Sequence, residues 1–149
     1  MRNLVGLMAC LVVVSAAAGQ SGPEPSLTLT RASAAHRFTA AELLARPDAA
    51  ELSIPDDISY GGATSYRAVP LLSLLSELPL DTGTDTLEAR STDGFVAQIP
   101  LPLVQKAAFG GSIPWIAIEP PGQPWPKLPG KDQGAGPFYL VWQNPERSG

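Results

Sequence analysis

Proline is the feature that most restricts the folds open to this chain. Its 149 residues include 16 prolines and 14 glycines, and the prolines are spread from Pro23 to Pro145. A proline inside a helix removes a hydrogen bond and clashes with the preceding turn, so few stretches can hold a long helix. The pattern excludes an all-helical bundle and favours short strands, turns and long ordered loops. Because 44% of the residues are hydrophobic, the chain can still bury a core, and its length allows one domain. We therefore predict a single α+β domain.

The N-terminal segment is predicted to be removed from the folded protein. Arg2 precedes an apolar run from Leu4 to Ala18, which ends in three alanines of the kind that a signal peptidase accepts. The run is short for a transmembrane helix, which needs about 20 residues. We interpret residues 1–18 as a cleaved signal peptide, which predicts a periplasmic or secreted protein with no membrane anchor after cleavage. An uncleaved anchor and a lipoprotein attached at Cys10 are the alternatives.

Cleavage would remove Cys10, the only cysteine, and this excludes several chemistries. A mature chain without cysteine has no disulfide, no thiolate metal ligand and no cysteine nucleophile. A single histidine, His36, is too little for a typical zinc site, so we predict no metal. No Gly-x-Ser-x-Gly motif accompanies it, and we expect an exposed or strand-end imidazole. The formal net charge of −4, without a cluster of basic residues, argues against nucleic-acid binding.

Local signals place the helices. Thr39 followed by Glu42 is a capping box, so a short helix should begin there, with Phe38 packing on Leu43, and should end before Pro47. Leucines spaced for one buried helical face follow Pro70, which predicts a second helix up to residue 78. A third short apolar helix or turn is expected to follow Pro100 and to reach about residue 108.

Alternation and β-branched or aromatic composition predict the strands. We expect Pro55, Asp56 and Asp57 to break one of them, and we expect the last two to be central in a sheet because they are almost wholly apolar. The loop between those two, residues 119–137, is rich in proline and glycine and should be ordered. The expected strands are Leu27–Thr30, Leu52–Ile54, Tyr66–Val69, Thr86–Arg90, Phe95–Ile99, Trp115–Ile118 and Phe138–Trp142.

These elements divide the chain into four parts. Residues 1–18 form the predicted signal peptide, and residues 19–26 form a flexible leader that contains proline and glycine. Residues 27–143 form the domain. Residues 144–149 form a polar tail, which leaves open whether the gene product is truncated at Gly149.

The order of several motifs resembles a known family. Tyr66–Leu75 reads Tyr-Arg-Ala-Val-Pro-Leu-Leu-Ser-Leu-Leu, Ser91–Phe95 reads Ser-Thr-Asp-Gly-Phe, and Gly136–Trp142 reads Gly-Pro-Phe-Tyr-Leu-Val-Trp after the long loop. Together they are similar to the molybdopterin-binding oxidoreductase domain of the sulfite-oxidase type, in its small exported form. The resemblance covers about residues 38–142. It implies a mixed, curved β-sheet with short helices around a cofactor groove, molybdopterin as cofactor, and a c-type cytochrome or another periplasmic redox protein as partner.

The chain departs from that family at the metal ligand. Family enzymes hold molybdenum through a cysteine sulfur after the strand matched here by residues 52–54, whereas residues 55–59 read Pro-Asp-Asp-Ile-Ser. The carboxylates of Asp56 or Asp57 would be harder and weaker substitutes for a soft thiolate. We therefore expect an accessory module associated with redox proteins, with no cofactor bound. The alternatives are an active molybdopterin-dependent oxidoreductase subunit that passes electrons to a c-type cytochrome, and a periplasmic ligand-binding module without redox function.

The family topology suggests which residues would line a cleft, although no catalytic residue is assigned. Basic side chains and the backbone of glycine-rich turns suit a phosphate or another small oxyanion. We expect Asp93 to serve its turn and Trp125 to anchor the long loop, with Lys127 as a further basic residue near the cleft. The candidate cofactor-binding residues are Arg67, Lys131, Gly134, Gly136 and Tyr139.

Overall fold

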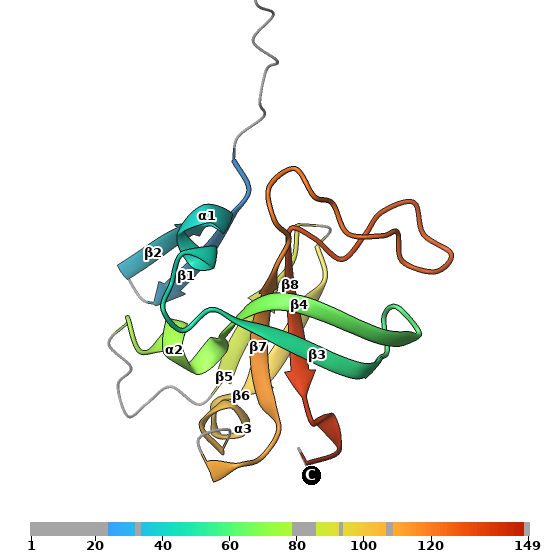
Figure 1. The fold of residues 1–149 in the computed structure, drawn as a ribbon. Coiled ribbons are helices and arrows are strands. Elements are labelled where there is room, and N and C mark those ends of the chain that lie inside the picture. The colour runs from blue at the N-terminus through green and yellow to red at the C-terminus, as the bar shows by residue number, and fades with distance from the viewer. Residues whose placement is uncertain (1–23, 32–33, 79–85, 93, 107–108, 148–149) are drawn as a thin grey trace, which may run out of the picture.

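The computed structural model describes residues 24–31, 34–78, 86–92, 94–106 and 109–147. Within them the chain forms eight strands, three short α-helices and one 3-10 helix (Figure 1). The strands are β1 (Ser26–Arg31), β2 (Ala34–Thr39), β3 (Ala50–Asp57), β4 (Gly62–Pro70), β5 (Thr86–Arg90), β6 (Val96–Pro100), β7 (Ile113–Ile118) and β8 (Phe138–Gln143). The helices are α1 (Ala40–Leu44), α2 (Leu71–Leu75), α3 (Leu101–Lys106) and the 3-10 helix η2 (Pro145–Arg147).

The α+β class is confirmed, and the strands are divided among three antiparallel sheets. The central one has four strands in the order β3-β4-β7-β8, while β1-β2 and β5-β6 are separate hairpins. The predicted signal peptide and most of the predicted leader lie outside the described residues. The predicted polar tail contains η2.

The prediction that both of the last strands are central is wrong for one of them. β7 lies between β4 and β8, but β8 is an edge strand of the four-stranded sheet. Hydrophobicity reports that the faces of a strand are covered, and it carries no information on whether both edges are paired. Side chains of β8 pack into both hydrophobic clusters of the protein, which explains its composition.

The predicted break at Pro55 is also wrong, because β3 continues through Pro55 and Asp56 to Asp57. Two features make this proline tolerable. β3 is the other edge strand of the sheet, where a missing N–H need not cost a ladder hydrogen bond. In addition, the pairing with β4 shifts register between Ile54 and Asp57, which marks a β-bulge or irregularity.

The first helix follows the sequence prediction closely. The backbone N–H of Thr39 donates to Glu42 Oε2 at 2.7 Å, and the N–H of Glu42 donates to Thr39 Oγ1 at 3.2 Å, so the capping box is complete. Phe38 and Leu43 are buried in the same cluster, as the predicted staple requires. The strand β2 that leads into this helix was not predicted.

The second helix is shorter than predicted, but its buried face is the expected one. It spans Leu71–Leu75 with Pro70 as its N-cap, and Leu71, Leu74 and Leu75 are buried. The hairpin of β5 and β6 is confirmed, although Phe95 precedes β6 and is exposed. The third helix ends at Lys106.

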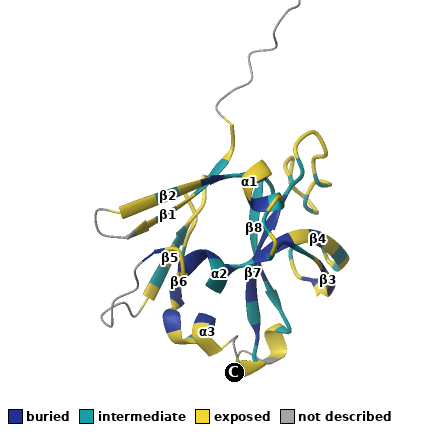
Figure 2. Ribbon diagram, turned by 60° about the vertical axis from the view of Figure 1, so that its left-hand side comes forward, coloured by how far each residue is buried: buried dark blue, intermediate teal, exposed yellow. Residues whose placement is uncertain are grey.

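Two hydrophobic clusters cover opposite faces of the four-stranded sheet. Figure 2 marks the buried residues of its strands β4 and β7 in dark blue. Successive residues of a strand point to opposite faces, so Val69 belongs to one cluster and Ala68 to the other. We call the first the leucine core; its buried members are Phe38, Ala40, Leu43, Ala49, Val69, Leu71, Leu74, Leu75, Ile99, Leu101, Val104, Ile116 and Ile118. We call the second the aromatic core; it consists of Leu52, Ile54, Tyr66, Ala68, Ala117 and Val141, with Tyr60, Trp115, Trp125 and Tyr139 packed against them.

Candidate functional site

The loop of residues 119–137 is fastened to the aromatic core by Tyr60. The hydroxyl of Tyr60 donates to the carbonyl of Pro126 at 3.2 Å and accepts from the N–H of Ala135 at 3.1 Å. One side chain from the β3–β4 turn thus holds two distant points of the loop. The loop projects beyond the sheet from the ends of β7 and β8, as Figure 1 shows in orange. Its predicted order is explained by these tethers.

Glu119 fastens the loop from within. Its Oε2 accepts the N–H of Trp125 at 2.7 Å, so the carboxylate closes the first half of the loop. The backbone of Glu119 also bonds the far end of the loop, because its N–H donates to the carbonyl of Pro137 at 2.9 Å. Trp125 then lies edge-on to Tyr66, with ring centroids 5.0 Å apart. Trp125 therefore anchors the loop, as the sequence suggested.

Asp57 is the centre of the polar network beneath this loop. The residue is only 2% exposed, yet each carboxylate oxygen has protein donors. Oδ1 accepts from the N–H groups of Ser59 at 2.9 Å and Tyr60 at 3.2 Å, and Oδ2 accepts from Tyr66 at 2.8 Å and Thr64 at 3.3 Å. A buried carboxylate is tolerated when its lone pairs are satisfied in this way.

The third tyrosine, Tyr139 of β8, completes the network. Its hydroxyl lies 2.8 Å from Ser59 Oγ and 3.3 Å from Asp57 Oδ1, and its ring lies edge-on to Tyr66 at 5.8 Å. Asp57 thus accepts from the hydroxyls of Tyr66 and Tyr139 and from the backbone N–H of Tyr60. Burial raises the pKa of Tyr66 and of Tyr139, and the neighbouring Asp57 carboxylate adds to both shifts. Both phenols therefore stay protonated and able to donate at neutral pH.

The glycines predicted to approach an oxyanion approach the chain's own oxygen atoms. A Cβ on Gly136 would lie 2.4 Å from Glu119 Oε2. A Cβ on Gly134 would lie 2.9 Å from the carbonyl oxygen of Pro126. Close backbone approach is the physical reason for glycine at both positions, as expected. The partner in each case is part of the protein, namely the loop and its internal carboxylate.

The structure separates the candidate cofactor-binding residues. Tyr139, Gly134 and Gly136 lie at the aromatic core and its loop. Arg67 is exposed on β4 and alternates with Tyr66, so it lies on the opposite face of the sheet. Lys131 is exposed in the loop, where its N–H donates to the carbonyl of Leu128.

Two further residues were considered from the sequence, Lys127 and Asp93. Lys127 lies 4.0 Å from Asp132 in an exposed ion pair within the loop. Asp93 lies outside the described residues. Four residues hold the site together: sequence reasoning considered Asp57 only as a substitute metal ligand, and it missed Tyr60, Tyr66 and Glu119. The signal that could have revealed the role of Asp57 is an Asx turn. Its carboxylate accepts the N–H groups of the residues two and three positions later.

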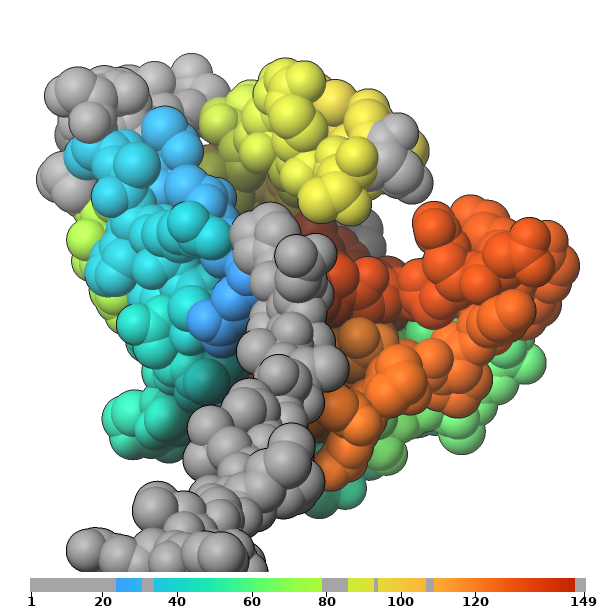
Figure 3. All heavy atoms as spheres, turned by 90° about the horizontal axis from the view of Figure 1, so that it is seen from above, coloured from blue at the N-terminus to red at the C-terminus, as the bar shows by residue number. Residues whose placement is uncertain are grey.

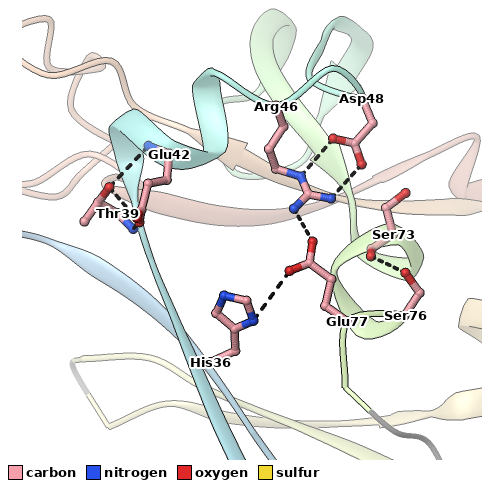
Figure 4. Close-up of polar contacts among 8 residues, drawn as sticks. All are labelled: His36, Thr39, Glu42, Arg46, Asp48, Ser73, Ser76 and Glu77. Atoms are coloured by element: carbon pink, nitrogen blue, oxygen red, sulfur yellow. Dashed lines mark hydrogen bonds and ion pairs between the residues drawn. The ribbon is translucent and has the colours of Figure 1, made fainter.

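A second polar cluster joins the N-terminal hairpin to α1 and α2 (Figure 4). His36 Nδ1 lies 3.5 Å from Glu77 Oε2, and its ring stacks on Phe38 with centroids 4.1 Å apart. Arg46 donates both to Glu77 and, at 2.8 Å and 3.0 Å, to the two oxygens of Asp48. Arg46 lowers the pKa of Asp48, whereas Asp48 and then Glu77 raise the pKa of Arg46. The imidazole is 44% exposed, as its sequence context suggested.

The residues present do not fit the metal ligation of the family that the sequence resembles. Where the family carries a thiolate, after the strand matched by residues 52–54, the buried side chain is Asp57, and its oxygens already accept from five donors of the chain. Among the described residues no group of three or more His, Cys, Asp or Glu side chains is placed to hold a metal ion. No helix in the described part of the chain is long and apolar enough to cross a membrane.

Comparison with known proteins adds no assignment. No protein-family model, no curated protein and no solved structure matches the chain.

Proposed function

We propose that this protein is an exported accessory domain of the molybdopterin-oxidoreductase type, which serves a periplasmic redox protein and does not itself complete the oxidoreductase reaction. The observation that carries the proposal is the state of Asp57. It stands in the segment where the resembling family carries its metal-binding sulfur, and it is buried with its oxygens bonded to the chain's own N–H and O–H groups.

A metal could recruit Asp57 only at a high cost. Withdrawing the carboxylate would leave the hydroxyl of Tyr66, which is 4% exposed, without its acceptor. An unsatisfied buried polar group costs about 1–3 kcal/mol, and two backbone N–H groups would lose their acceptor as well. A hard carboxylate also replaces a soft thiolate poorly. The network therefore favours a structural role for Asp57, which stands at the position that would bind the metal.

The placement of the other motifs supports the family likeness. The Tyr66–Leu75 motif spans the junction of β4 and α2 at the middle of the fold. The Ser91–Phe95 motif lies at the turn between β5 and β6, where the N–H of Ser91 donates to the carbonyl of Phe95 at 2.9 Å. The Gly136–Trp142 motif closes the long loop and forms most of β8. Each motif thus falls at an element junction, where such patterns are expected.

Two other functions remain as proposals of lower rank. The order of the motifs favours an active molybdopterin-dependent subunit that passes electrons to a c-type cytochrome, because that is the family's activity. The glycine-rich loop beside Tyr139 favours a periplasmic ligand-binding module that recognises a small oxyanion through Lys131 and the loop backbone.

Analysis of the exported protein separates the three functions. The chain would be purified from its native host with its own leader, and molybdenum and pterin would be measured together with haem proteins that co-purify. The accessory function predicts neither molybdenum nor pterin in stoichiometric amount, and co-purification of a haem protein whose absorption spectrum is that of a c-type cytochrome. Stoichiometric molybdenum and pterin would replace the proposal by the active subunit. Absence of both a cofactor and any redox protein would favour the ligand-binding module.

A further inference from the structure

The outer edge of β8 presents a regular row of backbone groups that no described strand pairs. The N–H of Glu119 donates to the carbonyl of Pro137, which fixes the phase of the β7–β8 ladder. Hydrogen-bonded pairs recur at every second residue, so the N–H and C=O groups of Tyr139, Val141 and Gln143 point toward β7. The N–H and C=O groups of Phe138, Leu140 and Trp142 therefore point away from β7. Within the described residues, no strand pairs with that edge.

The two edges of the sheet are protected very differently. The β3 edge carries exposed Glu51, Pro55 and Asp56, which are the residue types that keep another strand from pairing. The β8 edge carries no charge and no proline between Phe138 and Gln143. Its side chains are half-buried, apart from the buried Val141. An apolar edge without such protection is a template for strand addition.

The surroundings of β8 limit what can pair with it. Figure 3 shows a hollow between the β5–β6 hairpin, in yellow, and the loop of residues 119–137, in orange, with the red of β8 between these two arms. Leu87 and Ala89 of the hairpin pack on the leucine core, whereas Trp125 of the loop packs on the aromatic core. The arms thus stand on opposite faces of the sheet. In a second copy the same two arms would flank β8, which disfavours pairing of two such edges and favours a single extended segment.

We propose that β8 accepts an uncharged, extended segment of a partner polypeptide as a fifth strand of the central sheet. The main chain of that segment bonds to Phe138, Leu140 and Trp142. Its side chains are apolar at alternate positions, on the face where Phe138, Leu140 and Trp142 pack, and they are uncharged because β8 carries no charge to pair with an ionised group. This proposal goes beyond the proposed function, since strand addition to β8 does not require that the partner polypeptide be a redox protein.

The first test compares two peptides that share side chains and differ only in the backbone. The probe is a soluble peptide of six alternating valines and threonines with a lysine at each end. The control carries N-methyl groups on every second amide, placed on the edge that would face β8. We expect the probe to bind and to slow the exchange of the Phe138, Leu140 and Trp142 amide protons, measured by NMR, and we expect the control to bind at least about tenfold more weakly. Equal binding of both peptides, or no binding of either, would overturn the proposal.

The second test uses variants of the protein. Leu140→Lys places a charge on the open edge, while its stem can still cover the leucine core. We expect it to weaken binding of the probe by about tenfold or more and to leave the far-UV circular dichroism unchanged. Glu51→Lys on the β3 edge is the matched control and should bind the probe like the parent protein. Retention of binding by Leu140→Lys would overturn the proposal, as would a concentration-dependent dimer in sedimentation that the probe dissociates.

Discussion

The two faces of the central sheet are held by different forces. The leucine core gathers side chains from three helices, two hairpins and the sheet, and its members share only apolar surface. The aromatic core is smaller, and its tyrosines are fixed by directed hydrogen bonds to one buried carboxylate. Burial alone is tolerant of geometry, whereas a buried polar network is stable only when every member is satisfied. The difference indicates that the first face supplies most of the stability and the second fixes the position of the long loop.

Removing volume from the leucine core should have the largest effect. Leu74 of α2 is fully buried, so Leu74→Ala loses transfer free energy and leaves a cavity. We expect the free energy of unfolding to fall by about 3 kcal/mol, measured by chemical denaturation. Leu72→Ala on the half-buried side of the same helix is the control and should lose clearly less. Equal losses of unfolding free energy in the two variants would contradict the claim that only one face of α2 packs fully into the leucine core.

Removing the carboxylate of Asp57 should disturb the aromatic core almost as strongly. Asp57→Ala leaves buried donors of Tyr66 and of the backbone without an acceptor. We expect a loss of about 2–3 kcal/mol, and a smaller one for Asp57→Asn, which keeps a single acceptor oxygen. Asp56→Ala, at the exposed neighbouring residue, should leave the free energy of unfolding nearly unchanged. If Asp57→Ala were as stable as the parent protein, the network could not be what organises this face.

Crowding the loop should affect its attachment rather than the leucine core. Gly136→Ala would press a Cβ against the carboxylate of Glu119, and we expect a loss of about 1–2 kcal/mol together with a change in the fluorescence of Trp125. Gly62→Ala is the matched control because its added Cβ would meet nothing within 4 Å. Unchanged fluorescence in Gly136→Ala would contradict the tether between Glu119 and Trp125.

The helix cap offers a smaller test on the side of the leucine core. Thr39→Ala removes the oxygen that accepts the N–H of Glu42, so we expect a loss of about 1 kcal/mol in denaturation. Thr39→Ser keeps that oxygen and should retain most of the stability. An alanine variant as stable as the serine variant would show that the box is not needed once the core has formed.

Alkaline pH should destabilise the aromatic core through Tyr66, and this is the smallest of the expected effects because it is absent near neutral pH. The pKa of Tyr66 is raised in the folded protein, so above about pH 10 the unfolded chain loses the phenolic proton that the folded chain keeps. The stability that this group contributes is complete below about pH 10 and decreases as the pH rises further. Tyr66→Phe should make the free energy of unfolding less dependent on pH in this range. An identical pH profile for Tyr66→Phe would contradict the assignment of the alkaline loss to Tyr66.

Local structure was largely readable from the sequence. The capping box at Thr39, the leucines of α2 and the hairpin of β5 and β6 depend on contacts between residues close in the chain, so their patterns predict them. Edge positions were not readable, and β3 and β8 were both misjudged for that reason.

The candidate site was only partly predictable. Tyr139, Gly134 and Gly136 lie in one region, because the long loop that holds the two glycines leads into β8, and their binding of a cofactor stays a prediction. Arg67 was grouped with them, but alternation along β4 places it on the far face.

By itself the sequence determined the α+β class, the helix starts and the need for glycine in the loop, since these follow from local sterics, hydrogen bonding and periodicity. Only the tertiary structure decided that Asp57 would meet the hydroxyls of Tyr66 and Tyr139 and that β8 would lie at an edge. The hydrogen bond between Asp57 and Tyr139 joins residues 82 positions apart, and no local pattern encodes which distant donor a carboxylate meets. That choice belongs to strand order, which is settled by the packing of the whole chain.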